Sequence, residues 1–484
     1  MITTPWGSAP SRSPDPPWQR LLDRINCLRN GGEDCRQSFH IHLAILSLVL
    51  TLALFRKALV AGPLKAKSLP PRLKSRAVVD DILVHPVKSC AAISLEKARI
   101  GRKGLELDRR WMVVRRGKEE GKWDKISLRE EPRLTLIQPS IEADGLHLSL
   151  SAQARLPDGA QPSLPPIAIP YRTTRDNCVE VLPSVAMWGD SADGLVVPLL
   201  PSSSSPQWSK SPSSWLSHFL GYEVRLIQFA PLDPSTEGER RAFPIYKDAH
   251  LAGKAEQARM RSDPQPLEWQ DEYPLLVASK ESLGDLQERI ADAGKAEDGS
   301  DGRGGRGVSE KMFSREKWKE RAGKGEADWL NIRRFRANIV LRGVDDNAES
   351  QEGAAAAKAN RSIRPWEEDQ WTRIDFPLPS SSSSPPETTT PCLHLVARCE
   401  RCLLTTVDPI TGEKQDAGVP LAFLRKDERS HLVKHMKEKG GHGRKGPIFG
   451  MYAIPGMGEE EGEEGFEVQK GMEVICWWRR EVEE

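Results

Sequence analysis

The chain of 484 residues carries 70 Lys and Arg against 69 Asp and Glu, a formal net charge of +1. A broad nucleic-acid-binding surface needs a clear excess of cations, so we expect no nucleic-acid partner. Hydrophobic residues make up 38%, enough for a sizeable core, and domains of ~100–200 residues predict two or three folded units. The eight cysteines are scattered, which is not a disulfide framework and favours a reducing compartment.

The N-terminal region is predicted to hold a membrane anchor. Residues 1–37 are rich in Ser and Pro and are expected to form a disordered arm. An apolar run follows, whose uninterrupted part, Leu43 to Phe55, has 13 residues against the ~20 that a spanning helix needs. If the Arg-Lys pair after it extends towards the headgroups, the run is long enough, and the following cations favour a cytosolic position for the rest. We predict a transmembrane helix over 38–62 and a basic linker over 63–77; a buried helix and a signal-peptide core are the alternatives.

A first β-rich unit is predicted over 78–230. Its strand segments are β-branched or alternate between apolar and polar residues, and turn residues separate them. A short helix, "SSWLSHFLG", is expected to end at Gly221. The expected strands are "AVVDDILVHPVKSC", "RRWMVVRRG", "PRLTLIQPSI", "GLHLSLSA", "VEVLPSVAMWGDSADG" and "YEVRLIQFA".

A second unit is predicted over 245–483, where Ser279 can cap the helix "KESLGDLQERIADA". Its expected strands are "PLLVAS", "FRANIVLRG", "CLHLVARCERCLLTTVD", "GPIFGMYAIPG" and "FEVQKGMEVICWW". Polar tracts at 201–214, 295–328 and 377–391 are predicted to be flexible insertions. Many short strands with few helices indicate a mixed α+β, β-rich fold built on β-barrels.

Two cysteines three residues apart, Cys399 and Cys402, have four possible roles. A zinc site would need further ligands, for which His394, His431, His435 or His442 are available. A redox dithiol would be expected at a helix N-terminus, whereas a β-prone run follows this pair. Two buried thiols, or one thiolate bound to a soft metal, are the remaining interpretations.

Six segments in order resemble the MOSC (molybdenum cofactor sulfurase C-terminal) family, in particular its membrane-anchored, amidoxime-reducing mitochondrial members. They are "HPVKS", "LDRRWMVV", "PRLTLI", "FRANIVLRG", "CERCLLTTVDPITGE" and "GPIFGMY". The resemblance implies a MOSC N-terminal β-barrel-like domain followed by a MOSC β-barrel domain. It also implies a molybdenum–molybdopterin cofactor whose metal is bound by Cys402, which is then the catalytic residue and the metal ligand, with Cys399 packing beside it.

The same resemblance implies a set of cofactor-binding residues, and their chemistry suits a phosphate and a polar pterin. This set is Lys88, Ser89, Arg109, Arg336, Asn338, Arg401 and Tyr452. Taken singly, each also has an ordinary structural role, such as a surface ion pair for Arg109 or a core aromatic for Tyr452. The sequence departs from the family pattern at Glu130, at Asp271 to Tyr273 and at Glu400, which puts the substrate range in doubt.

The implied activity is the reduction of N-hydroxylated compounds such as amidoximes. No dinucleotide-binding glycine pattern follows a strand, so electrons are expected from a partner protein. The resemblance implies that this partner is a cytochrome b5-type donor with its NADH-dependent reductase. Asp408 and Tyr452 are the candidate acids. The implied location is the mitochondrial outer membrane.

The alternative function is that of a MOSC protein that binds the cofactor or carries sulfur as a persulfide, without N-reductive turnover. Such a protein would be related to the pyridoxal-phosphate-dependent sulfurases.

Overall fold

A computed structural model describes most of the chain from Lys74 to Arg479. The described residues are 74–187, 190–200, 211–230, 251, 267–295, 316, 330–344, 361–377, 390–414, 419–426, 429, 446–456 and 465–479.

The larger barrel is built from strands that are distant in sequence. Its hydrogen-bonded order is β14-β13-β18-β17-β16-β20-β1, and the pairing of β14 with β1 closes it. Short strands β15 (Arg361–Ser362) and β2 (Ile93–Ser94) pair with β1. The barrel strands are β1 (Lys74–Val84), β13 (Leu275–Ser279), β14 (Ile339–Gly343), β16 (Trp371–Asp375), β17 (Cys392–Glu400), β18 (Ile448–Gly456) and β20 (Glu473–Trp478).

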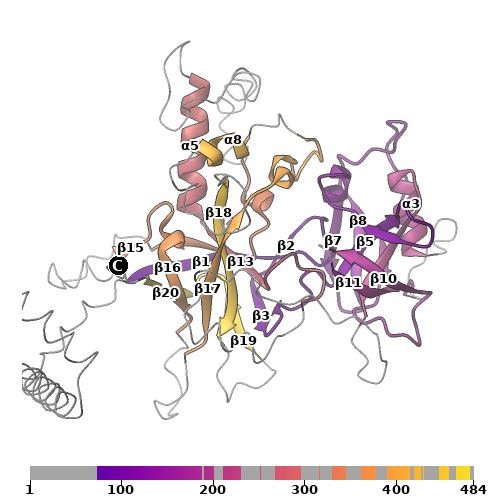
Figure 1. Ribbon diagram of the computed structural model, residues 1–484, viewed down its shortest axis with the longest axis horizontal. Helices are drawn as coiled ribbons and strands as arrows, with labels where there is room; N and C mark the ends of the chain where they lie inside the picture. The colour runs from indigo at the N-terminus through magenta and orange to yellow at the C-terminus, as the bar shows by residue number, and fades with distance from the viewer. Residues whose placement is uncertain are drawn as a thin grey trace, which may run out of the picture. The chain divides into compact units, whose positions relative to one another are not determined.

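Apolar side chains of these strands form one buried cluster, in which Ile82, Trp371 and Ile374 are fully buried. Alternate residues of a strand point to opposite faces, so each strand supplies the interior with every second side chain. In Figure 1, indigo β1 lies among the orange and yellow strands of the second half. A separate three-stranded sheet also joins early and late segments of the chain. It consists of β3 (Lys97–Gly101), β4 (Gly104–Leu105) and β19 (Phe466–Gln469).

A second closed barrel lies within the first half. It consists of β5 (Trp111–Arg116), β6 (Trp123–Lys125), β10 (Val181–Met187), β11 (Asp190–Val196) and β12 (Val224–Phe229). Strand β5 is buried on both faces, which explains why "WMVV" reads as a continuous apolar run. Met112 and Val114 belong to one hydrophobic cluster, whereas Trp111 and Val113 belong to another.

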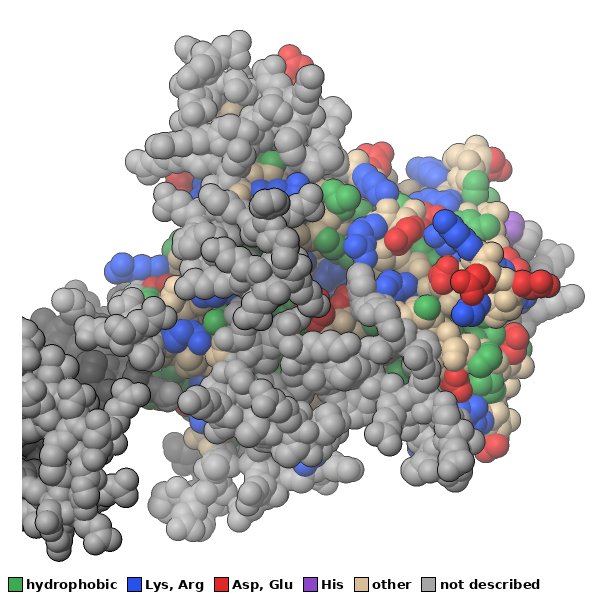
Figure 2. Space-filling view, in the orientation of Figure 1, with side chains coloured by type: hydrophobic (Ala, Val, Ile, Leu, Met, Phe, Trp, Pro, Cys, Tyr) green, Lys and Arg blue, Asp and Glu red, His purple; other side chains and the backbone are tan. Residues whose placement is uncertain are grey.

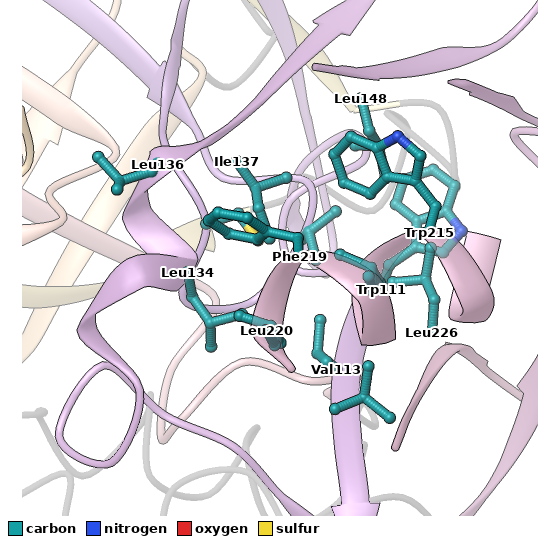
Figure 3. Packing of buried hydrophobic residues seen from close by; sticks show 14 of the residues in the cluster. Trp111, Val113, Leu134, Leu136, Ile137, Leu148, Trp215, Phe219, Leu220 and Leu226 are labelled. Atoms are coloured by element: carbon teal, nitrogen blue, oxygen red, sulfur yellow. The ribbon is translucent and has the colours of Figure 1, made fainter. Parts of the chain in front are cut away.

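The cluster around Trp111 lies between this barrel and a sheet of β7 (Ile137–Ile141), β8 (Leu146–Leu150) and β9 (Ile167–Ile169). Helix α3 (Pro212–Leu220) adds Trp215 and Phe219, whose rings lie among leucines in Figure 3. The helix is capped by Ser211 and ends at Gly221 with φ 82°, which confirms the predicted end.

Helix α5 (Lys280–Lys295) begins as predicted, because the Ser279 hydroxyl accepts a hydrogen bond from the Ser282 backbone N–H at 3.1 Å. The remaining short elements are η1 (Pro132–Leu136), η2 (Ile332–Phe335), η3 (Glu367–Gln370), η4 (Leu403–Thr406) and α8 (Leu421–Lys426). The predicted β-rich mixed fold with closed barrels is confirmed.

Several predicted details are wrong. Strand β1 begins at Lys74, inside the predicted linker. Its longer pairings are with β14 and β20 of the second unit, whereas in the first unit it pairs with the two-residue strand β2. Residues 132–136 and 403–406 form short 3-10 turns in place of the expected strands. Helix α3 takes residues 212–214 from the predicted insertion at 201–214. The strand assignments failed because local sequence cannot show which distant strand supplies a partner.

The predicted arm at 1–37 and the predicted transmembrane helix at 38–62 lie outside the described residues, as do most of the linker and of the insertions. Among the helices that the structure describes, none combines the length and the apolar character needed to cross a bilayer. The predicted location, a single-pass protein of the mitochondrial outer membrane, is therefore corrected. The physical reason is the apolar run itself, which has only 13 uninterrupted residues.

Candidate functional site

All eight residues predicted from the sequence line one pocket, which we call the central pocket. Its volume is about 190 Å³. The eight are Lys88, Ser89, Arg109, Arg336, Asn338, Arg401, Cys402 and Tyr452, and the other lining residues are Lys125, Ser127, Arg129, Asp271, Glu272, Tyr273, Leu275, Leu276, Phe335, Cys399, Glu400 and Leu404. The structure thus brings together side chains that lie up to 364 residues apart in sequence, from Lys88 to Tyr452.

A buried carboxylate, Asp108, positions the first wall of the pocket. It accepts a hydrogen bond from the His85 backbone N–H at 2.8 Å and pairs with the Arg109 guanidinium. Burial alone would raise the pKa of Asp108, but Arg109 and the bonds from His85 lower that pKa to about 2. The carboxylate therefore stays ionised and holds the "HPVKS" turn against the "LDRRW" turn.

The second wall comes from η2 and β14. Arg336 follows η2 with a left-handed backbone, and its guanidinium donates to the Cys90 carbonyl at 2.9 Å. Asn338 donates to the Leu83 carbonyl at 3.2 Å and accepts from the Leu276 N–H at 3.1 Å. Asn338 therefore joins β1, β13 and β14, and its role in the pocket is to fix the wall rather than to offer a spare hydrogen bond.

Three pocket residues adopt a backbone conformation that is rare outside glycine. Ser89, Arg109 and Arg336 have φ values of 72°, 52° and 54°. Such residues cost of order 1 kcal/mol or more and persist where the surrounding structure holds them. Their coincidence at one pocket is typical of a functional site.

Lys88 faces the pocket from a buried position. Its ammonium donates to the Trp269 carbonyl at 2.8 Å and to the Asp271 carboxylate at 2.6 Å. Burial lowers the pKa of Lys88 from 10.5 to about 8, although Asp271 opposes the change. Lys88 is therefore still mostly cationic at neutral pH.

The two cysteines have different surroundings. Cys402 is exposed at the pocket, between β17 and η4, whereas Cys399 is 2% exposed. The Cys399 sulfur accepts a hydrogen bond from Arg401 at 2.7 Å and another from Tyr452, and burial raises the pKa of its thiol. Cys402 is the thiol that a ligand in the pocket can reach.

Arg401 and Tyr452 both contact the buried sulfur of Cys399. Arg401 also donates to the Phe335 carbonyl at 2.8 Å, so its guanidinium has two acceptors, this carbonyl and the Cys399 sulfur. The Tyr452 ring stacks on Tyr273 with 4.8 Å between centroids. Burial and the neighbouring Cys399 raise the pKa of Tyr452 well above its usual value, so its hydroxyl keeps its proton.

The pocket wall carries more cations than acids. Its cations are Lys88, Lys125 and four arginines, against the carboxylates of Asp271, Glu272 and Glu400. The buried Nη2 of Arg336 and Nε of Arg401 have no hydrogen-bond partner in the part of the chain that the structure describes. On the described part of the face that Figure 2 shows, blue and red side chains are intermingled. This donor set fits an anionic, polar ligand beside a thiol.

Sequence reasoning missed Lys125, Ser127 and Arg129, which line the same pocket. The signal was the cationic segment that begins at Trp123, but nothing in it shows that β6 runs beside the pocket. Glu130 has a local role, since its carboxylate accepts from the Ser127 N–H at 2.9 Å.

The other candidate groups lie elsewhere. Asp408 pairs with Arg334 at 2.7 Å and accepts from the Ile410 N–H at 2.9 Å, so it holds a turn. His394 lies 3.7 Å from the Cys392 sulfur rather than beside Cys402. Over the described ranges, no three His, Cys, Asp or Glu side chains gather as a metal site would require, and the other three candidate histidines fall outside those ranges.

Comparison with known proteins matches part of the chain to one protein family. Residues 76–195 match the family described as MOSC N-terminal beta barrel domain. Residues 76–195 are therefore similar to this domain, and the predicted resemblance to the MOSC family is confirmed.

The curated relatives that match the chain fall into two groups with different names. Mitochondrial amidoxime-reducing component 1 is 25% identical in Mus musculus, over 79% of this chain and 78% of that protein, and 28% identical in Danio rerio, over 79% and 81%. Molybdenum cofactor sulfurase of Emericella nidulans is 26% identical over 75% of this chain. The chain spans only 38% of that sulfurase. A solved structure of a Bordetella bronchiseptica protein has a TM-score of 0.17 and 16% identity over 29% of the chain, too little to support an argument.

Proposed function

We propose that this chain binds a molybdenum–molybdopterin cofactor and reduces N-hydroxylated compounds such as amidoximes. One observation carries the proposal: an exposed thiol, Cys402, lies in the wall of a pocket rich in buried and half-buried cations. The relatives named amidoxime-reducing component, which match most of their length, support the choice of substrate class.

The residues of the pocket suit the cofactor by their chemistry. Lys88, Arg109 and Arg336 would hold its phosphate, since all three are cations and Arg336 has a buried N–H group available. Cys402 would bind the metal as a thiolate, a soft donor. When bound, the cofactor supplies the two-electron chemistry by which an amidoxime, two electrons and two protons give an amidine and water.

The protein supplies position and charge. Arg401 fixes the backbone next to Cys402 through its bonds to Cys399 and Phe335. Lys88 keeps its charge at neutral pH, and Tyr452 keeps its hydroxyl proton, so both remain hydrogen-bond donors at the site. The electron donor we propose is a cytochrome b5-type protein reduced by its NADH-dependent reductase.

Turnover tests the proposal directly. The purified full-length chain should contain molybdenum and pterin and should reduce benzamidoxime to benzamidine when a chemical reductant supplies electrons. The matched control is protein from a host that cannot make molybdopterin, which should be inactive. Equal activity in both preparations, or molybdenum-loaded protein without turnover, would reject the reductase.

A second function is favoured by the sulfurase relatives and by the exposure of Cys402. In it the thiol carries sulfur as a persulfide, with or without bound cofactor. Cyanide releases persulfide sulfur as thiocyanate, which can be measured. Thiocyanate release from wild type but not from Cys402→Ser, without benzamidoxime turnover, would favour this carrier.

A further inference from the structure

A second pocket meets the central pocket at Cys402, and we call it the Arg425 pocket. Its volume is about 530 Å³. The described part of its wall consists of Arg129, Glu400, Arg401, Cys402, Leu403, Arg425 and Pro447. Arg129, Glu400, Arg401 and Cys402 belong to both pockets, so the two spaces share a wall around one thiol.

The charges of the Arg425 pocket favour an anion. The described part of its wall contains three arginines and one carboxylate. Arg425 is exposed on α8. The carboxylate is that of Glu400, which is exposed and lies close to Gly446, where an added Cβ would be 2.8 Å from the carboxylate oxygen. A planar guanidinium binds carboxylates and phosphates with two parallel hydrogen bonds.

The pocket also has an apolar side. Leu403 is 50% exposed and is one of few large hydrophobic side chains in the described ranges with such exposure. It lines the pocket together with Pro447. A few cations beside apolar surface in a concave site are typical of binding for small organic anions.

We infer that the Arg425 pocket is the substrate-binding side of Cys402 and selects N-hydroxylated compounds that carry an anionic group on a short apolar spacer. This inference rests on the proposed function for its reaction, but its charge and its position beside Cys402 can be tested separately. Arg425 is then a specificity-determining residue, because it lines this pocket and not the central one.

Alkylation of Cys402 tests the site without any turnover. Iodoacetate and iodoacetamide attack the same thiolate, so the ratio of their rates reports the local charge and not the fraction of thiolate. The rates are measured by mass spectrometry of the Cys402 peptide in full-length protein from a host without molybdopterin. Arg425→Ala should lower the iodoacetate-to-iodoacetamide ratio about twofold to fivefold, as removal of one nearby charge in water predicts.

Two further variants make this test specific. Arg364→Ala, at an exposed arginine in neither pocket, should leave the ratio unchanged. Glu400→Gln should raise it, because the acid of the shared wall is removed. An unchanged ratio in Arg425→Ala, or an equal fall in Arg364→Ala, would overturn the inference.

Steady-state kinetics on cofactor-loaded protein then tests selection. Benzamidoxime and 4-carboxybenzamidoxime differ only in the carboxylate, and Arg425→Ala should raise the KM of the second at least about threefold more than the KM of the first. Turnover of both with equal KM changes would reject the pocket as the selector. If neither compound is reduced, the proposed function fails, whereas the alkylation ratio still decides whether an anion site adjoins Cys402.

Discussion

Asp108 shows how a single buried carboxylate organises the candidate site. It is 2% exposed, and it joins the His85 backbone to the Arg109 guanidinium. A charge in such a place is tolerated because its partner is also buried, and removal of one partner leaves the other charge without compensation. Arg109 depends on this pair for its orientation, since its left-handed backbone gives it few alternatives.

Substitution of this carboxylate should therefore destabilise the protein. We expect Asp108→Asn to lower the free energy of unfolding by about 3 kcal/mol, because Arg109 loses its buried counter-ion. Urea denaturation measures the change, with Asp176→Asn at an exposed position as the control, expected within about 0.5 kcal/mol of wild type.

The contribution of Asp108 to the free energy of unfolding should also depend on pH. The pKa of Asp108 is about 2 in the folded protein against 3.8 for the free carboxyl group, so its contribution is complete above about pH 4 and is lost as pH falls towards 2. The difference between wild type and Asp108→Asn should shrink over that range. A difference that stays constant would contradict the assigned role.

The two cysteines show what sequence can and cannot provide at this scale. The order of the six motifs predicted which side chains would share a pocket, and the structure brings all eight together. The resemblance implied that Cys399 packs beside the ligand, but its contact with Tyr452 could not be predicted from local sequence, because β17–β18 pairing brings that residue to it. Lys125 and Arg129 were missed for the same reason.

Among the elements, β18 brings Tyr452 to the pocket and depends on a glycine two residues earlier. Gly450 has φ +80°, and a Cβ there would lie 2.7 Å from the Val277 carbonyl oxygen of β13. Gly471 has the same φ, but nothing lies within 4 Å of the corresponding Cβ. The two glycines share this backbone conformation but differ in the space around them, since Gly450 lies buried in β18 and Gly471 lies in an exposed turn.

We expect Gly471→Ala to cost about 1 kcal/mol, the price of a left-handed backbone for a residue with a Cβ. Gly450→Ala should cost at least about 2 kcal/mol more, because β13 and β18 must separate to admit the methyl group. Thermal or urea unfolding of the two variants side by side provides the measurement. Equal costs would show that β18 does not approach β13 as closely as described.

Helix α5 and strand β1 mark the limits of prediction for elements. The Ser279 cap of α5 and the end of α3 at Gly221 follow from local chemistry, so both were predictable. The membership of β1 in the larger barrel was not, because its partners β14 and β20 lie some 260 and 400 residues later. Local pattern shows that a strand forms but not where it pairs.

For the described part of the molecule as a whole, the central pocket depends on segments from both halves. Lys88 and Arg109 come from turns that lead to the smaller barrel, that of β5, β6, β10, β11 and β12. Arg336, Cys402 and Tyr452 come from the second half. Strand β1 connects the "HPVKS" turn directly to the larger barrel. The site therefore requires the fold of the whole described region, which explains why no single motif identifies it.

The central claim is that the sulfur of Cys402, and not that of Cys399, binds molybdenum. Elemental analysis of purified full-length Cys402→Ser and Cys399→Ser tests it most directly, since the two variants make the same atomic change three residues apart. We predict that Cys399→Ser retains at least about half of the wild-type molybdenum and that Cys402→Ser retains less than about a tenth. Equal loss in both variants, or full molybdenum in Cys402→Ser, would contradict the account.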